Sequence, residues 1–213
     1  MDNIIYRPIN KNDYAQLKNL ICHSFNLDQY IHNINLLSCI KSEYLYSCLA
    51  EATYTCVAEK QGKIIGIIMG KANNNYFIKY KFYSILKTYW YQMKCTLYGL
   101  KYKHQLQGYR QIHNIYKKFS LKHQNEFDGV LTLFIVDEYY RGLGIGKTLF
   151  NNLLKYLKQQ QVKKIYLYTD TTCNYYFYEK HGFKRVEAEL LQIHKKHSLF
   201  NMTIFLYEYT LIN

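Results

Sequence analysis

The chain has 213 residues, 49% of them hydrophobic, and its 28 lysine and arginine residues against 15 acidic residues give a formal net charge of +13. A chain of this size and composition can bury a sizeable core and is most simply one domain, with room for an inserted segment. No run approaches the roughly 18 apolar residues of a membrane-spanning helix, and the N-terminus lacks the basic and apolar regions of a secretory signal.

The six cysteines show no C-x-x-C pair and no metal-like spacing. They indicate a reducing compartment, so we expect a soluble, cytoplasmic protein without a metal. The positive charge invites a nucleic-acid or membrane partner. However, only four of the basic residues are arginine, and lysine, asparagine, isoleucine and tyrosine are abundant. Codons biased toward A and T would give the same composition, so the charge alone does not identify a partner.

In chain order, the first predicted elements are a strand at residues 4–7, ended by Pro8, and a helix that begins near Asn10 or Asn12 and ends near Phe25. A second helix is predicted over residues 28–49. Two strands, 53–59 and 63–71, follow around Gln61-Gly62, a two-residue hairpin signal.

Residues 72–125 carry apolar residues at helical spacing in two runs, which predicts a helical hairpin broken near Gly99. Basic stripes follow these helices at Lys79, Lys87, Lys94 and Lys101, and then at Lys103, Arg110 and Lys117. No acidic residue occurs between Glu59 and Glu126.

Three interpretations of the 72–125 segment stay open at this point. It can be a lid whose aromatic face packs on the core while its lysines are solvated. It can be a surface for RNA or another acidic macromolecule, because aromatic side chains stack on bases and lysines neutralise phosphates. It can also be a basic amphipathic helix at an anionic membrane surface.

The next segment, residues 130–157, is the most informative part of the chain. A buried strand from Val130 to Val136 is followed by three glycines in five residues and then by an amphipathic helix. Gly142, Gly144 and Gly146 allow positive φ and close approach to the main chain. A loop of this kind before a helix directs N–H groups at one point and predicts a phosphate or pyrophosphate site.

Two common phosphate loops do not fit this segment. The dinucleotide fingerprint G-x-G-x-x-G would need a glycine at Leu149 or at Lys147. Gly146-Lys147-Thr148 would complete a Walker A motif, but Arg141 stands where the first glycine is needed. Instead, Arg141-x-x-Gly144-x-Gly146 resembles the acyl-CoA-binding signature of the GCN5-related N-acetyltransferases (GNATs). After a predicted strand at residues 163–169, the run NYYFYEKHGF from Asn174 to Phe183 resembles the second signature of that family.

The resemblance covers roughly residues 1–71 and 126–213 and implies an α/β (α+β) fold. The sheet would be mixed and mostly antiparallel, flanked by helices and splayed between its fourth and fifth strands, with 72–125 as a basic, tyrosine-rich helical insertion after the third strand. Further strands are predicted at 184–189 and 201–211, with a loop at 190–198.

The resemblance also implies N-acetyl transfer from acetyl-CoA to a primary amine of a small molecule by direct attack. Backbone N–H groups of the loop would hold the pyrophosphate, at Arg141, Gly142, Leu143, Gly144, Ile145, Gly146, Lys147 and Thr148. Main-chain groups at a strand bulge would bind the pantetheine arm, at Phe134, Ile135 and Val136, and Asn174 would contact the same arm.

Tyr178 would be the general acid that protonates the leaving thiolate, since a tyrosine hydroxyl keeps its proton at neutral pH. The general base is less defined, because the strand 130–136 contains no carboxylate. Asp170, at the end of the fifth predicted strand, is the first candidate, with Glu126 and Asp128 as alternatives. A neutral amine would need no base from the protein.

Two other functions remain compatible with the sequence. The acceptor can be a macromolecule, such as a protein amine or an aminoacyl-tRNA, docked on the basic 72–125 segment. Alternatively, the chain can be a CoA-binding protein without catalysis. The identity of the amine, the length of the acyl group and the oligomeric state are not predicted.

Overall fold

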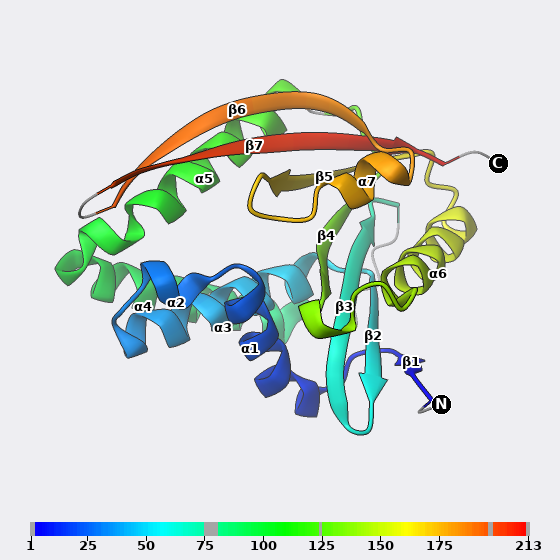
Figure 1. Cartoon of the computed structure of the whole chain (residues 1–213), viewed down its shortest axis with the longest axis horizontal. Helices are drawn as coiled ribbons and strands as arrows, with labels where there is room; N and C mark the ends of the chain where they lie inside the picture. Colours follow the sequence, from blue (N-terminus) through cyan, green and yellow to red (C-terminus); the bar gives the residue numbers. More distant parts are fainter. Residues whose placement is uncertain (1–2, 75–80, 124, 196–197, 212–213) are drawn as a thin grey trace.

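The structure, a computed structural model, describes residues 3–74, 81–123, 125–195 and 198–211. Within them lies one seven-stranded sheet in the order β1-β2-β3-β4-β5-β7-β6 (Figure 1). The strands are β1 (Ile5–Arg7), β2 (Tyr54–Lys60), β3 (Lys63–Ala72), β4 (Gly129–Val136), β5 (Lys164–Asp170), β6 (Lys184–Lys195) and β7 (Ser198–Thr210). All neighbouring pairs are antiparallel except β4 and β5. The predicted mixed, mostly antiparallel sheet is confirmed.

The sheet is splayed between β4 and β5, as predicted. These strands pair only where Gly129 lies opposite Ile165 and Val130 opposite Tyr166, and beyond that point they diverge (Figure 1). Gly129 is required at the junction, because a Cβ there would lie 2.4 Å from the Lys71 carbonyl oxygen on β3. The splay leaves the β5-facing edge of β4 without a strand partner after Val130.

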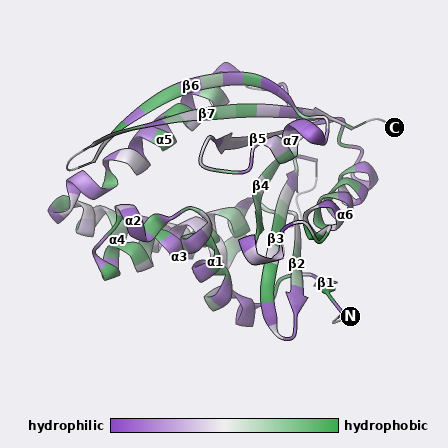
Figure 2. Ribbon diagram, viewed as in Figure 1, coloured by the Kyte–Doolittle hydropathy of each residue, from purple (hydrophilic) through white to green (hydrophobic). Residues whose placement is uncertain are grey.

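Helices cover both faces of the sheet. They are α1 (Tyr14–Ser24), α2 (Leu27–Tyr30), α3 (Ile34–Glu51), α4 (Lys81–Lys101), α5 (Lys103–Lys122), α6 (Ile145–Gln159) and α7 (Tyr176–Lys180), with 3₁₀ turns at Lys11–Asp13 and Glu138–Tyr140. Helix α6 packs on one face through Leu149 and Leu153. Helices α1 and α3 pack on the other through Leu17 and Leu45. Figure 2 shows the hydrophobic residues that run along β3 and β4 between these layers.

The helix predicted over residues 28–49 is interrupted. Helix α2 ends at Tyr30 and Ile31 is extended, and α3 starts behind Asn33, whose side chain accepts a hydrogen bond from the Leu36 N–H. This cap at Asn33 starts α3 as a separate helix, so the prediction of one continuous helix was wrong.

Helices α4 and α5 both form in the predicted 72–125 segment, but they diverge. Helix α4 continues through Gly99, where Leu106 packs closely, and the break falls at Tyr102. Helix α4 then lies along α3, whereas α5 crosses beneath β6 and β7 (Figure 1). The two helices therefore pack on different parts of the molecule and not mainly on each other. Lys79 of the predicted basic stripe lies outside the described residues.

The loop predicted at 190–198 was also wrong, because β6 extends to Lys195 and β7 begins at Ser198. The long hairpin covers α5: Leu191, Met202 and Ile204 form a buried cluster with Ile115 and Phe119. Packing of one face of the hairpin on the apolar side of α5 favours extended strands here over a loop. Within the described ranges, no helix is both long and apolar enough to cross a bilayer.

Candidate active site

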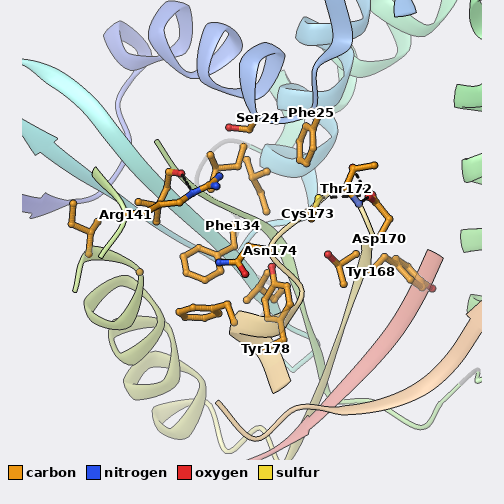
Figure 3. Close-up of a pocket in the computed structure, with 18 of the residues that line it drawn as sticks. Ser24, Phe25, Phe134, Arg141, Tyr168, Asp170, Thr172, Cys173, Asn174 and Tyr178 are labelled. Carbon is orange, nitrogen blue, oxygen red and sulfur yellow. Dashed lines mark hydrogen bonds between the residues drawn. The ribbon is translucent and has the colours of Figure 1, made fainter. Parts of the chain in front are cut away.

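A cavity of about 390 Å³ lies in the splay, between the loop before α6 at one end and the turn after β5 at the other (Figure 3). Most of the predicted site residues line it, namely Phe134, Ile135, Val136, Arg141, Gly142, Gly144, Ile145, Gly146, Lys147, Asp170, Asn174 and Tyr178. Leu143 and Thr148 are not part of the lining. The structure thus brings together residues from four separate parts of the chain.

The glycine loop has the backbone geometry that an anion site needs. Gly142 has φ of +82° and Gly144 has φ of +77°, a region that favours glycine. Helix α6 begins at Ile145, and its first backbone hydrogen bond runs from the Thr148 N–H to the Gly144 carbonyl oxygen at 3.0 Å. The N–H groups before Thr148 belong to the first turn, where a helix has no carbonyl partners for them, so they are available to an anion. Thr148 uses its own N–H within the helix, so this N–H is not available to a ligand.

Arg141 and Lys147 supply the positive charge at this end. The Arg141 Nε donates a hydrogen bond to the Val136 carbonyl oxygen at 3.3 Å, so the side chain ties the loop to the end of β4. Lys147 lies in the first turn of α6 and lines the cavity. Together with the N-terminus of α6, these two cations make this end suitable for a pyrophosphate.

The bulge of β4 is displaced from its predicted position. Leu133 pairs with Met69 and Leu131 pairs with Gly70, so Thr132 is the extra residue and the bulge precedes Phe134–Val136. Leu131 and Leu133 consequently belong to cores on opposite sides of the sheet. The hydroxyl oxygen of Thr132 is buried and has no hydrogen-bond partner within the described part of the chain. After the bulge, the free edge of β4 offers main-chain groups to an extended arm.

Tyr178 lies in the middle of the cavity wall. Its ring packs edge-on against Phe134 and Phe183, with centroid distances of 6.4 and 5.4 Å, and Figure 3 shows it directed toward the cavity. Burial raises the pKa of its phenol, and the nearby Cys173 and Asp170 raise this pKa further. The phenol therefore keeps its proton throughout the neutral range.

Asp170 ends β5 and lines the opposite end of the cavity. Its Oδ1 accepts hydrogen bonds from the Thr172 N–H at 2.7 Å and from the Thr172 hydroxyl, which fixes the carboxylate in its turn. The Cys173 thiol lies 3.8 Å from Oδ2. Burial and the charge of Asp170 raise the pKa of this thiol to about 11, so Cys173 stays neutral at physiological pH.

The two alternative bases lie elsewhere. Asp128 accepts hydrogen bonds from the N–H groups of Lys163 and Lys164, each at 3.0 Å, and Glu126 pairs with His123 at 3.0 Å. Neither carboxylate lines the cavity. Of the three predicted candidates, only Asp170 is brought into the site.

The sequence model of the Acetyltransferase (GNAT) family matches residues 79–183, a range that includes both the glycine loop and Tyr178. The chain belongs to the GNAT family. The match includes α4 and α5, whereas the resemblance seen in the sequence left out residues 72–125. As a GNAT protein, the chain is an acyltransferase that uses acetyl-CoA. A search of curated proteins found no significant match.

Solved GNAT structures resemble the chain over nearly its whole length. A GNAT-family acetyltransferase from Staphylococcus aureus Mu50 has 18% identity and a TM-score of 0.52, with 99% of this chain and 100% of that chain covered. The PaiA N-acetyltransferase from Thermoplasma acidophilum, in complex with coenzyme A, has 15% identity and a TM-score of 0.52, with 98% and 99% covered. An aminoglycoside 6'-acetyltransferase type Ii has 16% identity and a TM-score of 0.56, with 98% of each chain covered. At such identities the likeness is one of fold.

Two features described above have the geometry that a ligand with phosphates and an amide-containing arm needs, namely the glycine loop and the free edge of β4. Gly142 and Gly144 have no atom within 4 Å of an ideal Cβ position, so the loop is open on the side where a ligand would approach. The start of α6 offers N–H groups, and the free edge of β4 can pair with an amide-containing arm. Among the described residues, no group of three His, Cys, Asp or Glu side chains is placed to hold a metal ion.

The far end of the cavity is aromatic, and sequence analysis did not identify it. It is formed by Phe25 after α1, Tyr44 on α3, Tyr116 on α5 and Tyr168 on β5. Tyr116 and Tyr168 stack with centroids 4.4 Å apart, and the Tyr168 hydroxyl donates to the Tyr116 carbonyl oxygen at 3.2 Å. Burial raises the pKa values of Tyr44 and Tyr116. In a strand, residues two apart point to the same face, which places Tyr168 beside Asp170 on β5. This alternation is the one feature of the sequence that could have indicated the aromatic end of the cavity.

Proposed function

We propose that the protein transfers the acetyl group of acetyl-CoA to the primary amine of a small, cationic molecule by direct attack. The observation that carries the proposal is the separation of charge along the cavity. Among the described residues, the basic side chains that line the cavity are Arg141 and Lys147 at the loop, and the carboxylate that lines it is Asp170 at the aromatic end. Phosphates suit the first end, and an ammonium group suits a carboxylate surrounded by aromatic rings.

The proposed roles follow from this arrangement. The acceptor amine, held near Asp170, gives up a proton to the carboxylate directly or through water and attacks the thioester carbonyl. The new C–N bond forms as the C–S bond breaks, and Tyr178 gives its proton to the departing sulfur. The products are the N-acetylated amine and CoA with a free thiol. Main-chain groups of Phe134–Val136 and the side chain of Asn174 would orient the pantetheine arm.

The aromatic lining at the far end of the cavity favours a small acceptor over a macromolecule. Rings are contributed by α3, α5, β5 and the residue that follows α1, and Tyr116 on α5 stacks on Tyr168. A flexible amine of low molecular weight fits between such walls. A lysine on a folded protein or an aminoacyl-tRNA would have to insert its amine between these rings.

Donor binding is tested by calorimetric titration with acetyl-CoA of the wild type, Gly144→Glu and Gly62→Glu. Gly62 is a matched control, since it also has φ of +77° and open surroundings but lies in the β2–β3 hairpin. We expect micromolar binding, about 8 kcal/mol, in the wild type and in Gly62→Glu and its loss in Gly144→Glu, where a carboxylate would repel the pyrophosphate. Equal binding in all three proteins would remove the loop from the donor site.

The acceptor class is tested by measuring the free CoA thiol released with diamines, neutral aromatic amines, peptides and aminoacyl-tRNA. We expect the diamines to be the best acceptors and Asp170→Asn to lower their kcat/KM at least 100-fold, without changing acetyl-CoA affinity. Turnover that occurs with peptides or tRNA alone would overturn the small-molecule proposal while leaving donor binding intact.

A further inference from the structure

The outer face of α4 exposes an apolar strip that plays no part in the active site. Apart from the adjacent pair Tyr89 and Trp90, its members recur every three or four residues. They range from 48% exposed for Trp90 to 77% for Phe82 and are Phe82, Leu86, Tyr89, Trp90, Met93, Leu97 and Leu100. The opposite face of α4 packs on α3, where Tyr91 stacks on Tyr46 with centroids 5.7 Å apart. The strip is therefore the free side of an anchored helix, about 30 Å long. Exposed apolar surface of this extent marks an interaction site.

Lysines follow one edge of this α4 strip. Lys87, Lys94 and Lys101 are spaced seven residues apart, which is nearly two helical turns. The Lys94 ammonium lies 5.0 Å from the centroid of the Trp90 ring, and the Lys87 ammonium lies 5.6 Å from that of Tyr83. Helix α4 carries no acidic residue at all. The face is thus apolar along its centre and positive along one border.

We propose that this face of α4 binds an anionic lipid surface, with the helix lying in the plane of the interface. A basic amphipathic helix with aromatic and aliphatic residues on its apolar side is suited to the boundary between headgroups and acyl chains, and lysines attract anionic lipids. Trp90 and Tyr89 lie on this apolar face, and amphipathic rings such as theirs prefer the membrane–water interface. None of the residues that line the active-site cavity comes from α4, so docking would leave that cavity accessible.

Two other partners fit this α4 face less well. Nucleic-acid bases stack on aromatic rings, but Leu86, Met93, Leu97 and Leu100 are aliphatic and gain only from an apolar environment. A second copy of the chain would bring rows of lysines together without an acidic residue on either α4 to compensate. A bilayer with anionic headgroups satisfies both the apolar strip and its charged border.

Trp90 is the chain's one tryptophan, and its fluorescence therefore reports directly on this α4 face. The probe is a vesicle of about one phosphatidylserine per two phosphatidylcholines, compared with a vesicle of phosphatidylcholine alone. We expect emission to shift to shorter wavelength with the anionic vesicles only. Brominated acyl chains should then quench it. Unchanged emission with anionic vesicles would overturn the proposal.

Co-sedimentation with the same vesicles tests the two parts of the α4 face separately. The charge variant is Lys87→Gln/Lys94→Gln/Lys101→Gln, and its control is Lys155→Gln/Lys158→Gln/Lys184→Gln, which removes the same charge from exposed lysines on α6 and β6. Each lysine near an anionic surface contributes about a factor of five, so we expect roughly 100-fold weaker binding for the α4 variant. Equal weakening in both variants would show attraction by total charge and would overturn the assignment to α4.

The apolar part is tested with Leu86→Gln/Met93→Gln/Leu97→Gln, which keeps every lysine of α4. We expect it to lose vesicle binding and the shift of Trp90 emission. Retained acetyl-CoA binding in every variant shows that the fold is intact. Quenching of Trp90 by poly-uridine without any response to vesicles, or a dimer at micromolar concentration that this variant abolishes, would each overturn the proposal in favour of that partner.

Discussion

The phenol of Tyr178 is buried against Phe134 and Phe183, and its pKa is raised by that burial and by Cys173 and Asp170. In the proposed reaction it is the group that supplies a proton to the leaving sulfur. Replacement by phenylalanine keeps the ring and its packing but removes that proton. We expect Tyr178→Phe to lower kcat by about 100-fold or more.

Two measurements decide whether this loss is catalytic. Calorimetry should give the same acetyl-CoA affinity for Tyr178→Phe as for the wild type, and the thermal midpoint should change little, because the hydroxyl is the only group removed. Since the raised pKa keeps Tyr178 protonated, wild-type activity should not fall through loss of this proton below about pH 10. Undiminished turnover in Tyr178→Phe would exclude the tyrosine from proton transfer.

Gly129 is a second residue with a specific role, at the junction where β4 meets both β3 and β5. A Cβ at this position would lie 2.4 Å from the Lys71 carbonyl oxygen and 3.3 Å from the Cγ2 of Ile165. Because the first of these atoms is backbone, relief requires the strands to separate. We expect Gly129→Ala to destabilise the protein by about 1–3 kcal/mol, measured by urea denaturation.

Gly146→Ala is the control for Gly129→Ala. Its added Cβ would meet ring atoms of Phe177 and Phe134 at 3.4 and 3.5 Å, which is ordinary contact, and alanine is the better helix former. Stability should stay the same or rise. If Gly129→Ala were as stable as the wild type, close packing would not explain the glycine at the junction.

At the scale of elements, the contact between α5 and β6 depends on a cluster of charges at the end of α5. His123 lies between two carboxylates, with Nε2 2.9 Å from Glu187 and Nδ1 3.0 Å from Glu126. Lys122 also pairs with Glu187, and Lys118 pairs with Glu189 at 2.6 Å. Burial lowers the pKa of His123, but its hydrogen bonds to Glu187 and Glu126 outweigh this and raise the pKa overall.

The direction of the pH effect follows from the raised pKa of His123. The folded state holds this proton more tightly than the unfolded state, so the stabilisation is complete below the unfolded pKa of about 6.5. It is lost as pH rises through the higher pKa of the folded state. We expect the thermal midpoint of the wild type to exceed that of His123→Gln by about 2 °C near pH 6 and the difference to shrink toward pH 8.5.

His104→Gln is a suitable control for this pH effect, since His104 is an exposed histidine near the start of α5. Its thermal midpoint should follow that of the wild type across the pH range. A difference between wild type and His123→Gln that grows with pH would contradict the assigned direction. The measurement is differential scanning fluorimetry at constant ionic strength, because these partly exposed pairs are sensitive to salt.

At the scale of the whole molecule, the sequence predicted those parts whose signals are local. The strand, glycine loop and helix from Val130 to Leu157 carry turn chemistry and periodicity within one short segment, and they form as predicted. The sequence did not predict which elements pack against each other. Periodicity showed that α4 and α5 each have an apolar side, but it could not show that α5 packs on β6 and β7 while α4 lies along α3.

The aromatic end of the cavity shows the same limit for the site. Four distant parts of the chain supply these rings, at Phe25, Tyr44, Tyr116 and Tyr168. In a chain with 25 tyrosines, residue type gives no signal. Asp170 could be proposed because it ends a predicted strand. Its aromatic neighbours depend on the path of α5, which only the tertiary structure supplies.

The splay places the cavity between two halves of the sheet, so we expect a bound donor to stabilise the whole molecule. The half of the sheet from β1 to β4 meets the half from β5 to β6 through the pairs Gly129–Ile165 and Val130–Tyr166, and the cavity is lined by both halves. A ligand bound there stabilises the fold by about 2.7 kcal/mol at 100 times its Kd. For a chain of this size we expect the thermal midpoint to rise by about 5–11 °C.

Hydrogen exchange distinguishes bridging of the two halves from local ordering of the loop. Acetyl-CoA should slow amide exchange on β4 and also on β5 and α7, because an arm held by the edge of β4 and by Asn174 couples the two halves. Gly144→Glu should show neither the thermal shift nor this protection, whereas Gly62→Glu should show both. Protection confined to residues 141–148 would mean that the ligand orders only the loop, and the divergence of β4 from β5 would then have to be maintained by protein packing alone.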